Sequence, residues 1–410
     1  MSKSKKILPE LRFPEFKNAG EWKIKEVGEI FDITRGYVLA MSSVQEKQSK
    51  ENPYPVFSSQ TKNNGLAGFY KEYLYEDAIT WTTDGANAGD VNYRSGKFYC
   101  TNVCGVLLNK NGFANKCIAE LINSVSKNYV SYVGNPKLMN GVMSQIKIPI
   151  PTIQEQQKIA SCLSSLDEVI EAHSKKLELL KDHKKGLMQN LFPQDGETVP
   201  KLRFKEFENS GEWEEKKISD LGETISGLTG KSKDDFGAGK PFVTYKQVFD
   251  NSEINFEQCE RVQISDDENQ TSLQQGDILF TTSSETPNEV GFASVLIDFP
   301  KEKTYLNSFC FALRPFNIEK TQPQFSRYLF HSPIYRRSVT AIAQGSTRYN
   351  ISKGAFVEIQ VPIPAPTEQQ KIASCLSSLD EVIEAQVAKI EQLKLHKKGL
   401  MQGLFPKIND

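Results

Sequence analysis

The sequence predicts an α+β protein. Two mixed α/β domains are separated by two long helices, and the helices form an antiparallel coiled coil with a pseudo-twofold internal repeat. The main observation is a repeated segment, since EQQKIASCLSSLDEVIEA runs from Glu155 to Ala172 and again from Glu368 to Ala385. The motifs HKKGLMQ and LFP also occur twice, at the same spacing. This spacing is far longer than a solenoid repeat, so we infer that a whole module is duplicated.

A second repeated element precedes each copy and defines the domain layout. LPELRFPEFKNAGEW ends at Trp22 and VPKLRFKEFENSGEW ends at Trp213, and the segments between these motifs and the helices differ in length and sequence. We therefore expect a variable block, a constant helix, a second variable block and a second constant helix. The predicted boundaries are 1–153 and 196–366 for the two domains, and 154–195 and 367–410 for the two helical spacers.

Each repeated segment has the apolar spacing of a heptad seam. Proline-rich stretches, PIPTIQEQQ and PIPAPTEQQ, precede the helices and favour a sharp change from strand to helix. Roughly 36 helical residues would make a rod of roughly 54 Å, which is suited to a spacer. The seam residues are Ile159, Leu163, Leu166, Ile170, Leu177, Leu180, Leu187 and Leu191 in the first copy, and Ile372, Leu376, Leu379, Ile383, Ile390, Leu393, Leu400 and Leu404 in the second.

Polar residues within the seam favour an antiparallel arrangement. A parallel pair in register would stack Lys184 on Lys397, whereas an antiparallel pair directs each lysine toward the opposite half of the other helix. Two alternatives remain open at this stage. Each helix could pack only on its own domain, or helices of several chains could form an intermolecular bundle.

The two variable blocks have the alternation and turn residues of short strands. The first contains YPVFSSQTKNNGLAGFY and YEDAITWTTDGANAGDV, and the second contains KPFVTYKQVF, GDILFTTSSETPNEVGFASV and RYNISKGAFVEIQVPIP. One helix is expected at about 323–343. Clusters of Thr, Ser, Asn and Gly near Tyr, Lys and Arg suit hydrogen bonding to base edges and phosphates, although ordinary turn chemistry gives the same composition.

The composition is that of a soluble globular protein with room for two or three domains. The chain has 410 residues, a formal net charge of −1 and seven cysteines. No apolar run is long enough for a membrane span, and the start MSKSKK lacks the apolar part of a signal peptide, so we expect a cytoplasmic protein with reduced, structural thiols. A balanced charge means that any contact with nucleic acid must come from local patches.

The sequence offers no catalytic constellation. SGLTGKS lacks the first glycine of a phosphate loop, because Ile225 occupies that position, and NPYP from Asn52 departs from the adenine methyltransferase tetrapeptide at Tyr54. A nuclease pattern around Lys23 is lost in the repeat, where Glu214 stands instead. We therefore predict no metal site and no catalytic residues.

The layout resembles the specificity subunit of type I restriction-modification enzymes. The resemblance covers nearly the whole chain and is carried by PELRFPEF and PKLRFKEF, by IKIPIPTIQEQQKIA and IQVPIPAPTEQQKIA, by HKKGLMQNLFP and HKKGLMQGLFP, and by GDILFTTSSETPNEVG. It implies two target-recognition domains that each read one half of a split sequence in double-stranded DNA, without catalysis by this chain. It also implies two methyltransferase subunits docked on the helices and motor-nuclease restriction subunits that join the complex, with no membrane partner. S-adenosylmethionine, ATP and magnesium would belong to those partners, and this chain would hold no cofactor.

With that resemblance in view, we nominate DNA-binding residues in both blocks. The first block has no close counterpart of GDILFTTSS, and YEDAITWTTDGANAGDV is its nearest analogue. The alternatives are a stand-alone methyltransferase or nuclease that reads its own site, and a two-headed protein scaffold without nucleic acid. The nominated residues are Ser58, Ser59, Thr82, Thr83, Asn135 and Lys137 in the first block, and Tyr245, Lys246, Thr281, Ser283, Arg348 and Tyr349 in the second.

Overall fold

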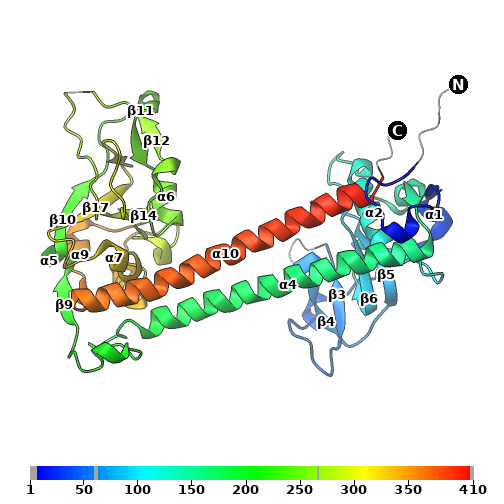
Figure 1. Ribbon diagram of the computed structural model, residues 1–410, viewed down its shortest axis with the longest axis horizontal. Coiled ribbons are helices and arrows are strands. Elements are labelled where there is room, and N and C mark those ends of the chain that lie inside the picture. Colours follow the sequence, from blue (N-terminus) through cyan, green and yellow to red (C-terminus); the bar gives the residue numbers. More distant parts are fainter. Residues whose placement is uncertain (1–6, 60–62, 266, 407–410) are drawn as a thin grey trace. The chain divides into compact units, whose positions relative to one another are not determined.

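The computed structural model describes residues 7–59, 63–265 and 267–406. The chain divides into two compact units (Figure 1). Unit 1 comprises Met1–Lys175 and Ala388–Asp410, and unit 2 comprises Lys176–Val387. Each unit contains one variable block and segments of both long helices, α4 (Ile153–Asn190) and α10 (Pro366–Leu404). The structure thus has the two α+β parts that the sequence predicts.

Unit 1 is built on a six-stranded sheet with the order β2-β7-β5-β6-β3-β4. Neighbouring strands are antiparallel except β3 and β6, which run parallel. A separate antiparallel pair, β1 with β8, leads into α4. The elements are β1 (Lys23–Glu26), α1 (Val27–Ile30), β2 (Asp32–Arg35), β3 (Tyr54–Phe57), β4 (Leu66–Tyr70), β5 (Tyr75–Thr82), β6 (Val91–Cys100), β7 (Cys104–Leu108), α2 (Lys116–Ser126), α3 (Asn140–Gln145) and β8 (Lys147–Ile150).

Unit 2 has a four-stranded sheet, β10-β17-β13-β15, and a three-stranded sheet, β12-β11-β16. The pair β9 with β19 leads into α10, as β1 with β8 leads into α4. The elements are β9 (Glu214–Lys217), α5 (Ile218–Leu221), β10 (Gly222–Ser226), β11 (Phe236–Val243), α6 (Tyr245–Asp250), β12 (Glu260–Val262), β13 (Ile278–Thr281), β14 (Ser283–Ser284), β15 (Ala293–Val295), β16 (Tyr305–Leu306), β17 (Cys310–Pro315), α7 (Pro323–Leu329), α8 (Pro333–Ala341), β18 (Tyr349–Asn350), α9 (Lys353–Val357) and β19 (Gln360–Ile363).

The two units share a strand order although their sequences differ. In unit 1, β5 lies between β7 and β6, and in unit 2, β13 lies between β17 and β15. The long strand β6 pairs with β5 through its first part and with β3 through its last residues. In unit 2 these two roles belong to separate strands, β15 and β16. The analogy between YEDAITWTTDGANAGDV and GDILFTTSSETPNEVG is therefore matched by the positions of β5 and β13.

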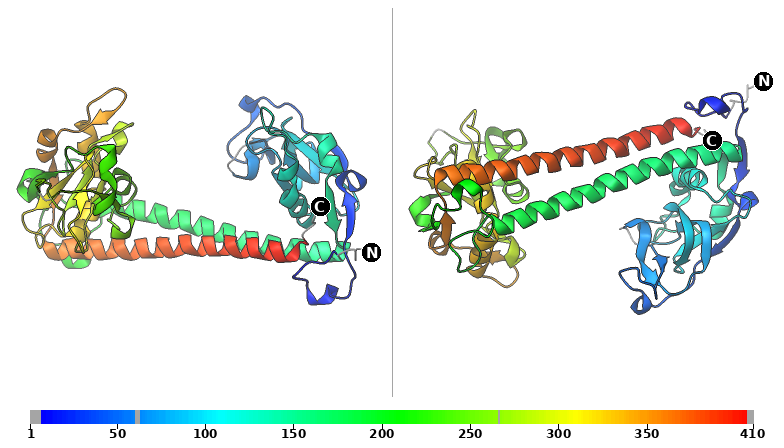
Figure 2. Two further views of the ribbon diagram at one scale, coloured as in Figure 1. Left: turned by 90° about the horizontal axis from the view of Figure 1, so that it is seen from above. Right: turned by 60° about the horizontal axis from the view of Figure 1, so that its bottom comes forward.

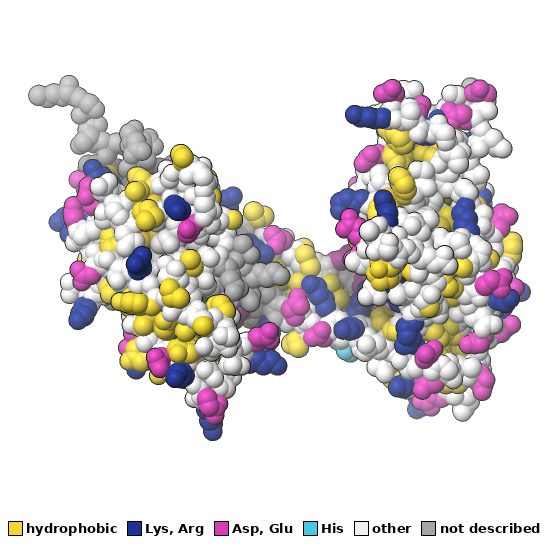
Figure 3. Space-filling view, turned by 180° about the vertical axis from the view of Figure 1, so that it is seen from behind, with side chains coloured by type: hydrophobic (Ala, Val, Ile, Leu, Met, Phe, Trp, Pro, Cys, Tyr) yellow, Lys and Arg dark blue, Asp and Glu magenta, His cyan; other side chains and the backbone are white. Residues whose placement is uncertain are grey.

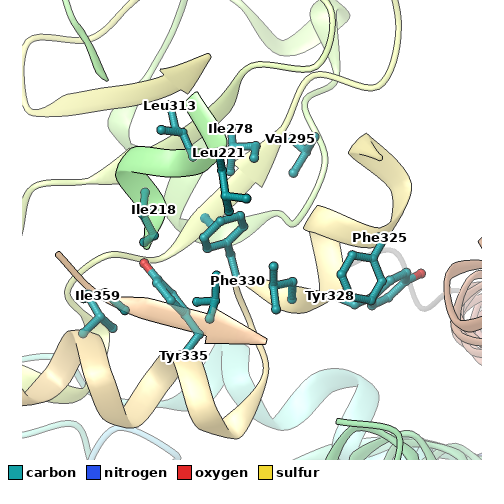
Figure 4. Packing of buried hydrophobic residues seen from close by; sticks show 14 of the residues in the cluster. Ile218, Leu221, Ile278, Val295, Leu313, Phe325, Tyr328, Phe330, Tyr335 and Ile359 are labelled. Carbon is teal, nitrogen blue, oxygen red and sulfur yellow. The ribbon is translucent and has the colours of Figure 1, made fainter. Parts of the chain in front are cut away.

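Aromatic side chains fill the main core of unit 2. Phe280 of β13 contacts the rings of Phe311, Phe330 and Phe356, with ring centres 5.4, 5.0 and 4.7 Å away. Figure 4 shows Phe330 among side chains from α5, β13 and α8. Such pairs stabilise a core by about 0.5–1.5 kcal/mol beyond the burial of their area. This packing holds β13, and therefore the residues that follow it, in a defined place.

The core of unit 1 joins the sheet, α2 and the ends of both long helices. Trp81 of β5 is buried and its indole Nε1 donates to the carbonyl of Leu138 at 3.0 Å. Ile159 and Leu163 of α4 belong to the same cluster as Leu404 of α10. Gly105 faces the indole of Trp81, and a Cβ there would lie 2.1 Å from Trp81 Cζ2, so only glycine fits.

Within each unit, the segments of α4 and α10 run in opposite directions. In unit 1, Lys397 meets Asp167, and the later residue Leu404 joins the cluster of the earlier residues Ile159 and Leu163. Figure 2 shows the last turns of α10 beside the first turns of α4. In unit 2, Lys184 pairs with Asp380. No helix within the described residues is long and apolar enough to span a membrane.

The prediction of a single helix at about 323–343 is wrong, because the structure has two helices there. The helix α7 ends at Leu329, and α8 begins at Pro333 after Ser332, whose hydroxyl accepts from the Tyr335 N–H as an N-cap. Proline at the first helical position and serine just before it are strong start signals. These signals divide the segment into two helices.

Candidate nucleic-acid interface

The last residues of β5 and β13 make equivalent backbone hydrogen bonds, each within its own unit. The Thr82 N–H donates to the Asp90 carbonyl at 3.0 Å, and the Gly89 N–H donates back to the Thr82 carbonyl at 2.9 Å. In unit 2, Thr281 makes the equivalent bonds with Phe292, at 3.0 Å, and with Gly291, at 3.1 Å. Each strand is thus followed by a loop that returns to the residue where the strand ends.

The next residue extends the frame to two further loops. Thr83 N–H donates to the Val103 carbonyl at 3.0 Å, and the Thr83 carbonyl accepts from Leu138 N–H at 2.9 Å. Thr282 makes the matching bonds with Phe309 and Ile351, both at 3.0 Å. The residues just before Leu138 and Ile351 form loops of equal length, 131–137 and 344–350, each closed by a β-bridge between its ends. We call this set of bonds the loop frame.

In unit 1, the structure brings the nominated residues around the loop frame. Asn135 Nδ2 donates to Asp84 Oδ1, and the Lys137 N–H donates to the Ser131 carbonyl at 2.9 Å; both side chains are exposed. Thr83 Oγ1 donates to the Val103 carbonyl at 2.9 Å, and Thr82 is buried. Thr82 and Thr83 therefore belong to the frame. Asn135 and Lys137 face solvent.

The nominated serines of unit 1 lie beside this frame, at the end of β3. The hydroxyl of Ser58 accepts from Thr101 Oγ1 at 2.9 Å, and the Ser59 carbonyl accepts from Asn87 Nδ2 at 3.2 Å. Asn87 is part of the loop that follows β5. These contacts bring the β3 end to the same edge of the unit.

In unit 2, Ser283 contacts two other nominated residues, and its neighbour Ser284 pairs with a third. Its carbonyl accepts from the Tyr245 hydroxyl at 2.6 Å, its hydroxyl accepts from Arg348 Nε at 3.1 Å, and its neighbour Ser284 pairs with Tyr349. Burial is the largest cause that raises the pKa of Tyr245. The phenol is therefore a neutral donor at physiological pH.

The remaining nominated residues of unit 2 differ in exposure. Arg348 is exposed, and its guanidinium lies 5.7 Å from the ring centre of the exposed Phe309. Lys246 is exposed and pairs with Asp250 one turn later in α6. Thr281 is buried, and its hydroxyl accepts from the Phe292 N–H at 3.0 Å. Thr281 thus supports the frame, whereas Arg348 and Lys246 are open to a partner.

Helical residues hold the loop that follows each strand. Ser126 of α2 donates to the Gly89 carbonyl at 2.6 Å, and Tyr335 of α8 donates to the Gly291 carbonyl at 2.9 Å. Arg336 donates to the carbonyls of Asn288, Val290 and Gly291, and burial lowers its pKa. Arg336 thus supports the loop that follows β13.

A small polar cavity opens beside the frame of unit 1. It has a volume of about 210 Å³ and is lined by Ser58, Thr80, Thr82 and Arg94, among others. Arg94 Nε donates to Thr80 Oγ1 at 3.0 Å, Nη2 donates to the Asn64 carbonyl at 2.7 Å, and the guanidinium lies 3.8 Å from the ring centre of Phe57. Burial lowers the pKa of Arg94 to about 10, so the group remains a cation at neutral pH.

The surface charge is mixed on the face that Figure 3 shows, where lysine and arginine alternate with aspartate and glutamate. Exposed apolar residues lie on the loops at the frame: Tyr132 and Val133 are 68% and 92% exposed, and Phe309 is 57% exposed. The loops at the frame therefore present apolar side chains beside the exposed cations Lys137 and Arg348.

Two grooves beside the long helices are lined by equivalent residues of the repeat. One, of about 610 Å³ in unit 1, is bounded by Leu121, Val125 and Phe405, and the other, of about 470 Å³ in unit 2, is bounded by Tyr328, His331 and Pro333. Both share the repeated helix residues, which are Lys394, Lys397, Lys398, Met401 and Gln402 in unit 1 and Lys181, Lys184, Lys185, Met188 and Gln189 in unit 2.

No group of three or more His, Cys, Asp or Glu side chains in the described part of the chain is arranged to hold a metal ion. Burial raises the pKa of the Cys104 thiol to about 11, which opposes formation of a reactive thiolate.

A family model for the type I restriction modification DNA specificity domain matches the chain twice, at residues 19–182 and 210–395. The chain belongs to this specificity family. The two matches follow the internal repeat, since each includes one variable block and most of the helix after it.

Relatives in this specificity family align over most of the chain. The specificity subunit of the type I restriction enzyme MjaVIII from Methanocaldococcus jannaschii is 25% identical over 96% of this chain and 93% of its own length. The putative type I specificity subunit S.MpnORF507P from Mycoplasma pneumoniae is 29% identical over 87% of this chain and 88% of its own length.

A solved structure has the same fold. The S subunit of a type I restriction-modification system from M. genitalium has a TM-score of 0.59 and 16% sequence identity, over 98% of this chain and all of that one. At this low identity, the likeness concerns the fold and not individual residues.

Two features of this specificity-family chain are not visible in its sequence. The loop frame includes backbone hydrogen bonds between residues more than 50 positions apart, Thr83 with Leu138 and Thr282 with Ile351, and the side-chain types do not reveal them. Arg94 lies in the polar middle of β6, where the neighbouring residues are partly buried or exposed. Only its contact with Phe57 shows that it lies over an aromatic ring beside a cavity.

Proposed function

We propose that this chain is the DNA sequence-recognition subunit of a type I restriction-modification complex, and that its two units bind the two halves of a bipartite double-stranded DNA target. The observation that carries the proposal is the loop frame, which has the same backbone hydrogen bonds in both units but presents different side chains. Two reading surfaces on matched supports suit two half-sites of unlike sequence, because the spacing has to match and the sequence does not.

Contacts with DNA would be local. Among the nominated residues, the exposed cations at or near the frames are Lys137, Lys246 and Arg348, and the formal net charge of the chain is −1. Phosphate contacts position a protein on the duplex, and base contacts supply the specificity. We infer that partner subunits contribute part of the phosphate neutralisation.

The long helices would hold the two units apart as an antiparallel coiled coil. Two equivalent ion pairs of the repeat support this: Lys184 meets Asp380 within unit 2, and Lys397 meets Asp167 within unit 1. A continuous helix such as α4, with 38 residues, has a length of about 57 Å at about 1.5 Å per residue. Such a rod can serve as a spacer.

The two equivalent grooves would seat two copies of one methyltransferase subunit. Their helix side is identical in both units, with three lysines, a methionine and a glutamine, while the residues opposite differ. Identical residues at two places favour two copies of the same partner. The exposed lysines, which are Lys181 and Lys185 in unit 2 and Lys394 and Lys398 in unit 1, suit a partner segment that carries carboxylates beside apolar side chains.

Catalysis would belong to the partners. S-adenosylmethionine would bind to the methyltransferase subunits, and ATP and magnesium to the restriction subunits that join them, so this chain would hold no cofactor. The relatives named above are themselves specificity subunits of type I restriction systems.

An exchange of variable blocks tests this function. Residues 23–145 are replaced by the corresponding block of another family member, and modified adenines are mapped in cells that express the methyltransferase partner. We expect one half of the modified sequence to change while the other half stays the same. A change in both halves would contradict independent reading, and modification that does not depend on this chain would favour the scaffold alternative. Methyl transfer by the purified chain alone would favour the stand-alone methyltransferase.

A further inference from the structure

Loops 131–137 and 344–350 are equivalent parts of the two units. Both have seven residues, and both are closed by a pair of backbone hydrogen bonds, at 2.9 Å and 2.9 Å between Ser131 and Lys137, and at 2.9 Å and 2.8 Å between Gln344 and Asn350. The residue after each loop is bonded to the frame threonine, Thr83 or Thr282. The equivalence therefore rests on backbone contacts and not on sequence likeness.

The fifth residue of each loop makes an equivalent side-chain contact. Asn135 Nδ2 donates to Asp84 Oδ1, and Arg348 Nε donates to Ser283 Oγ. Asp84 and Ser283 both stand two residues after the last threonine of the strand, Thr82 or Thr281. Each unit thus carries an exposed polar residue that is held by the residue next to the frame, and the residue types differ between units.

The contacts leave these side chains with the groups that bases require. Asn135 uses one amide N–H on Asp84 and keeps the other N–H and its Oδ1, which is the donor and acceptor pair that matches adenine N6 and N7. Arg348 uses Nε–H on Ser283 and keeps the N–H groups of both terminal nitrogens, which match guanine O6 and N7. The Asp84 carboxylate would repel a phosphate, so a base edge is the better partner for Asn135.

We propose that Asn135 and Arg348 are equivalent specificity-determining residues, and that Asn135 reads an adenine in one half-site and Arg348 reads a guanine in the other. Asp84 and Ser283 are the positioning residues of the two pairs. The inference rests on the proposed function and adds to it the residue and the base class at one position of each half-site.

Exchange of the two pairs is the test. One variant combines Asp84→Ser with Asn135→Arg, and the other combines Ser283→Asp with Arg348→Asn. With the methyltransferase partner present, modified sequences are mapped in cells. We expect a change from adenine to guanine at a single position of one half-site for the first variant, and the reverse change in the other half-site for the second. Unchanged sequences, or loss of preference at every position of the half-site, would overturn the inference.

A conservative variant keeps the test informative if an exchanged pair fails to fold. Arg348→Lys retains the positive charge but loses the two-pronged contact, so guanine preference at one position should fall by at least about tenfold while other positions keep theirs. A uniform weakening on all sequences would mean that Arg348 binds a phosphate, and it would overturn the base-reading role. The wild-type chain distinguishes a failure of this inference from a failure of the proposed function. If the wild-type chain directs no sequence-specific modification, the proposed function itself fails.

Discussion

Arg203 and Glu368 form a buried ion pair with two parallel hydrogen bonds, from Nε to Oε1 and from Nη2 to Oε2, each 2.8 Å long. Arg12 and Glu155 form the same pair in unit 1, with two bonds of 2.7 Å. Each arginine comes from the repeated motif before a variable block, and each glutamate lies in the first turn of a long helix. The pair therefore fixes the start of each helix against its own unit.

We expect Arg203→Met to destabilise unit 2 by about 3–5 kcal/mol, because it leaves the Glu368 carboxylate buried without its cation. The side chains of Arg203 and Glu368 are only 7% and 2% exposed, so water cannot replace the lost partner. Urea unfolding of the purified chain measures the change.

Lys371→Met is the matched control for Arg203→Met. Lys371 pairs with Glu206 at 2.8 Å in the same region, but these side chains are 49% and 48% exposed. An exposed pair contributes about 0–1 kcal/mol, so this variant should stay close to the wild type. Equal effects of the two substitutions would show that burial of the pair is not what matters.

We expect His331 to make unit 2 sensitive to acid. Burial lowers the pKa of His331 to about 4, and its neutral Nε2–H donates to the Ala293 carbonyl at 2.7 Å. The unfolded chain has the ordinary histidine pKa of about 6.5 and gains the proton first. Stability should thus be unaffected above that pKa and fall as the pH drops from about 6.5 toward 4, by about 2 kcal/mol at pH 5.

His331→Gln should remove much of that pH dependence, because glutamine offers an N–H donor and does not titrate. Urea unfolding at pH 7 and pH 5 gives the comparison. His396→Gln, on the exposed surface of α10, should keep the wild-type loss of stability on acidification. If His331→Gln loses as much stability as the wild type between these pH values, other groups cause the acid sensitivity.

Gly291 holds a position in the loop frame that other residues fit poorly. Its φ is +63°, and a Cβ there would lie 2.7 Å from Val339 Cγ2. Gly291→Ala should cost about 1–2 kcal/mol for the left-handed conformation, with a further cost for the contact with buried Val339. Gly230→Ala has a similar φ of +68° but open space around the Cβ, so it should show the first cost alone in urea unfolding. Equal losses of stability in the two variants would mean that the Val339 side chain moves aside without a measurable cost.

The sequence predicts the two long helices, because the repeat is nearly identical and its apolar spacing is regular. The positions of Lys184 and Lys397 in the seam also predict that the two lysines do not contact each other, and that each contacts the opposite half of the other helix. Within the units, they meet Asp380 and Asp167, the repeat equivalents of one another.

The candidate DNA-binding residues were predictable only in part. Three of the nominated residues, Thr82, Thr281 and Ser283, are buried. Strand ends and turns use the same hydroxyl residues as DNA interfaces do, so residue type alone does not separate the two roles. The sequences around Asn135 and Arg348 are not similar, so the sequence does not indicate that the two residues are equivalent. Their equivalence comes from backbone bonds to Thr83 and Thr282, which form only when distant segments of each unit pack together.

Charge reversal in the grooves tests the seats for two identical partners. Lys185→Glu or Lys398→Glu alone should leave one methyltransferase subunit bound per chain, and the double variant should bind none, as measured by native mass spectrometry. Both lysines are exposed, so the fold should tolerate the change. Lys176→Glu with Lys389→Glu is the control, since these exposed lysines are equivalent in the repeat but do not line the grooves. Two partners on the double groove variant would contradict the proposed seats.

The length of the helices should set the distance between the two half-sites. Four residues inserted between Ala172 and His173, together with four between Ala385 and Gln386, lengthen both helices at equivalent points of the repeat by roughly 6 Å each. A four-residue insertion is a stutter that a coiled coil absorbs by local unwinding. Because duplex DNA rises about 3.4 Å per base pair, the preferred spacer should grow by one or two base pairs while both half-sites stay the same. Adenine-modification mapping with the folded variant measures the spacer. An unchanged spacer would mean that the helices seat partner subunits without setting the distance between the half-sites.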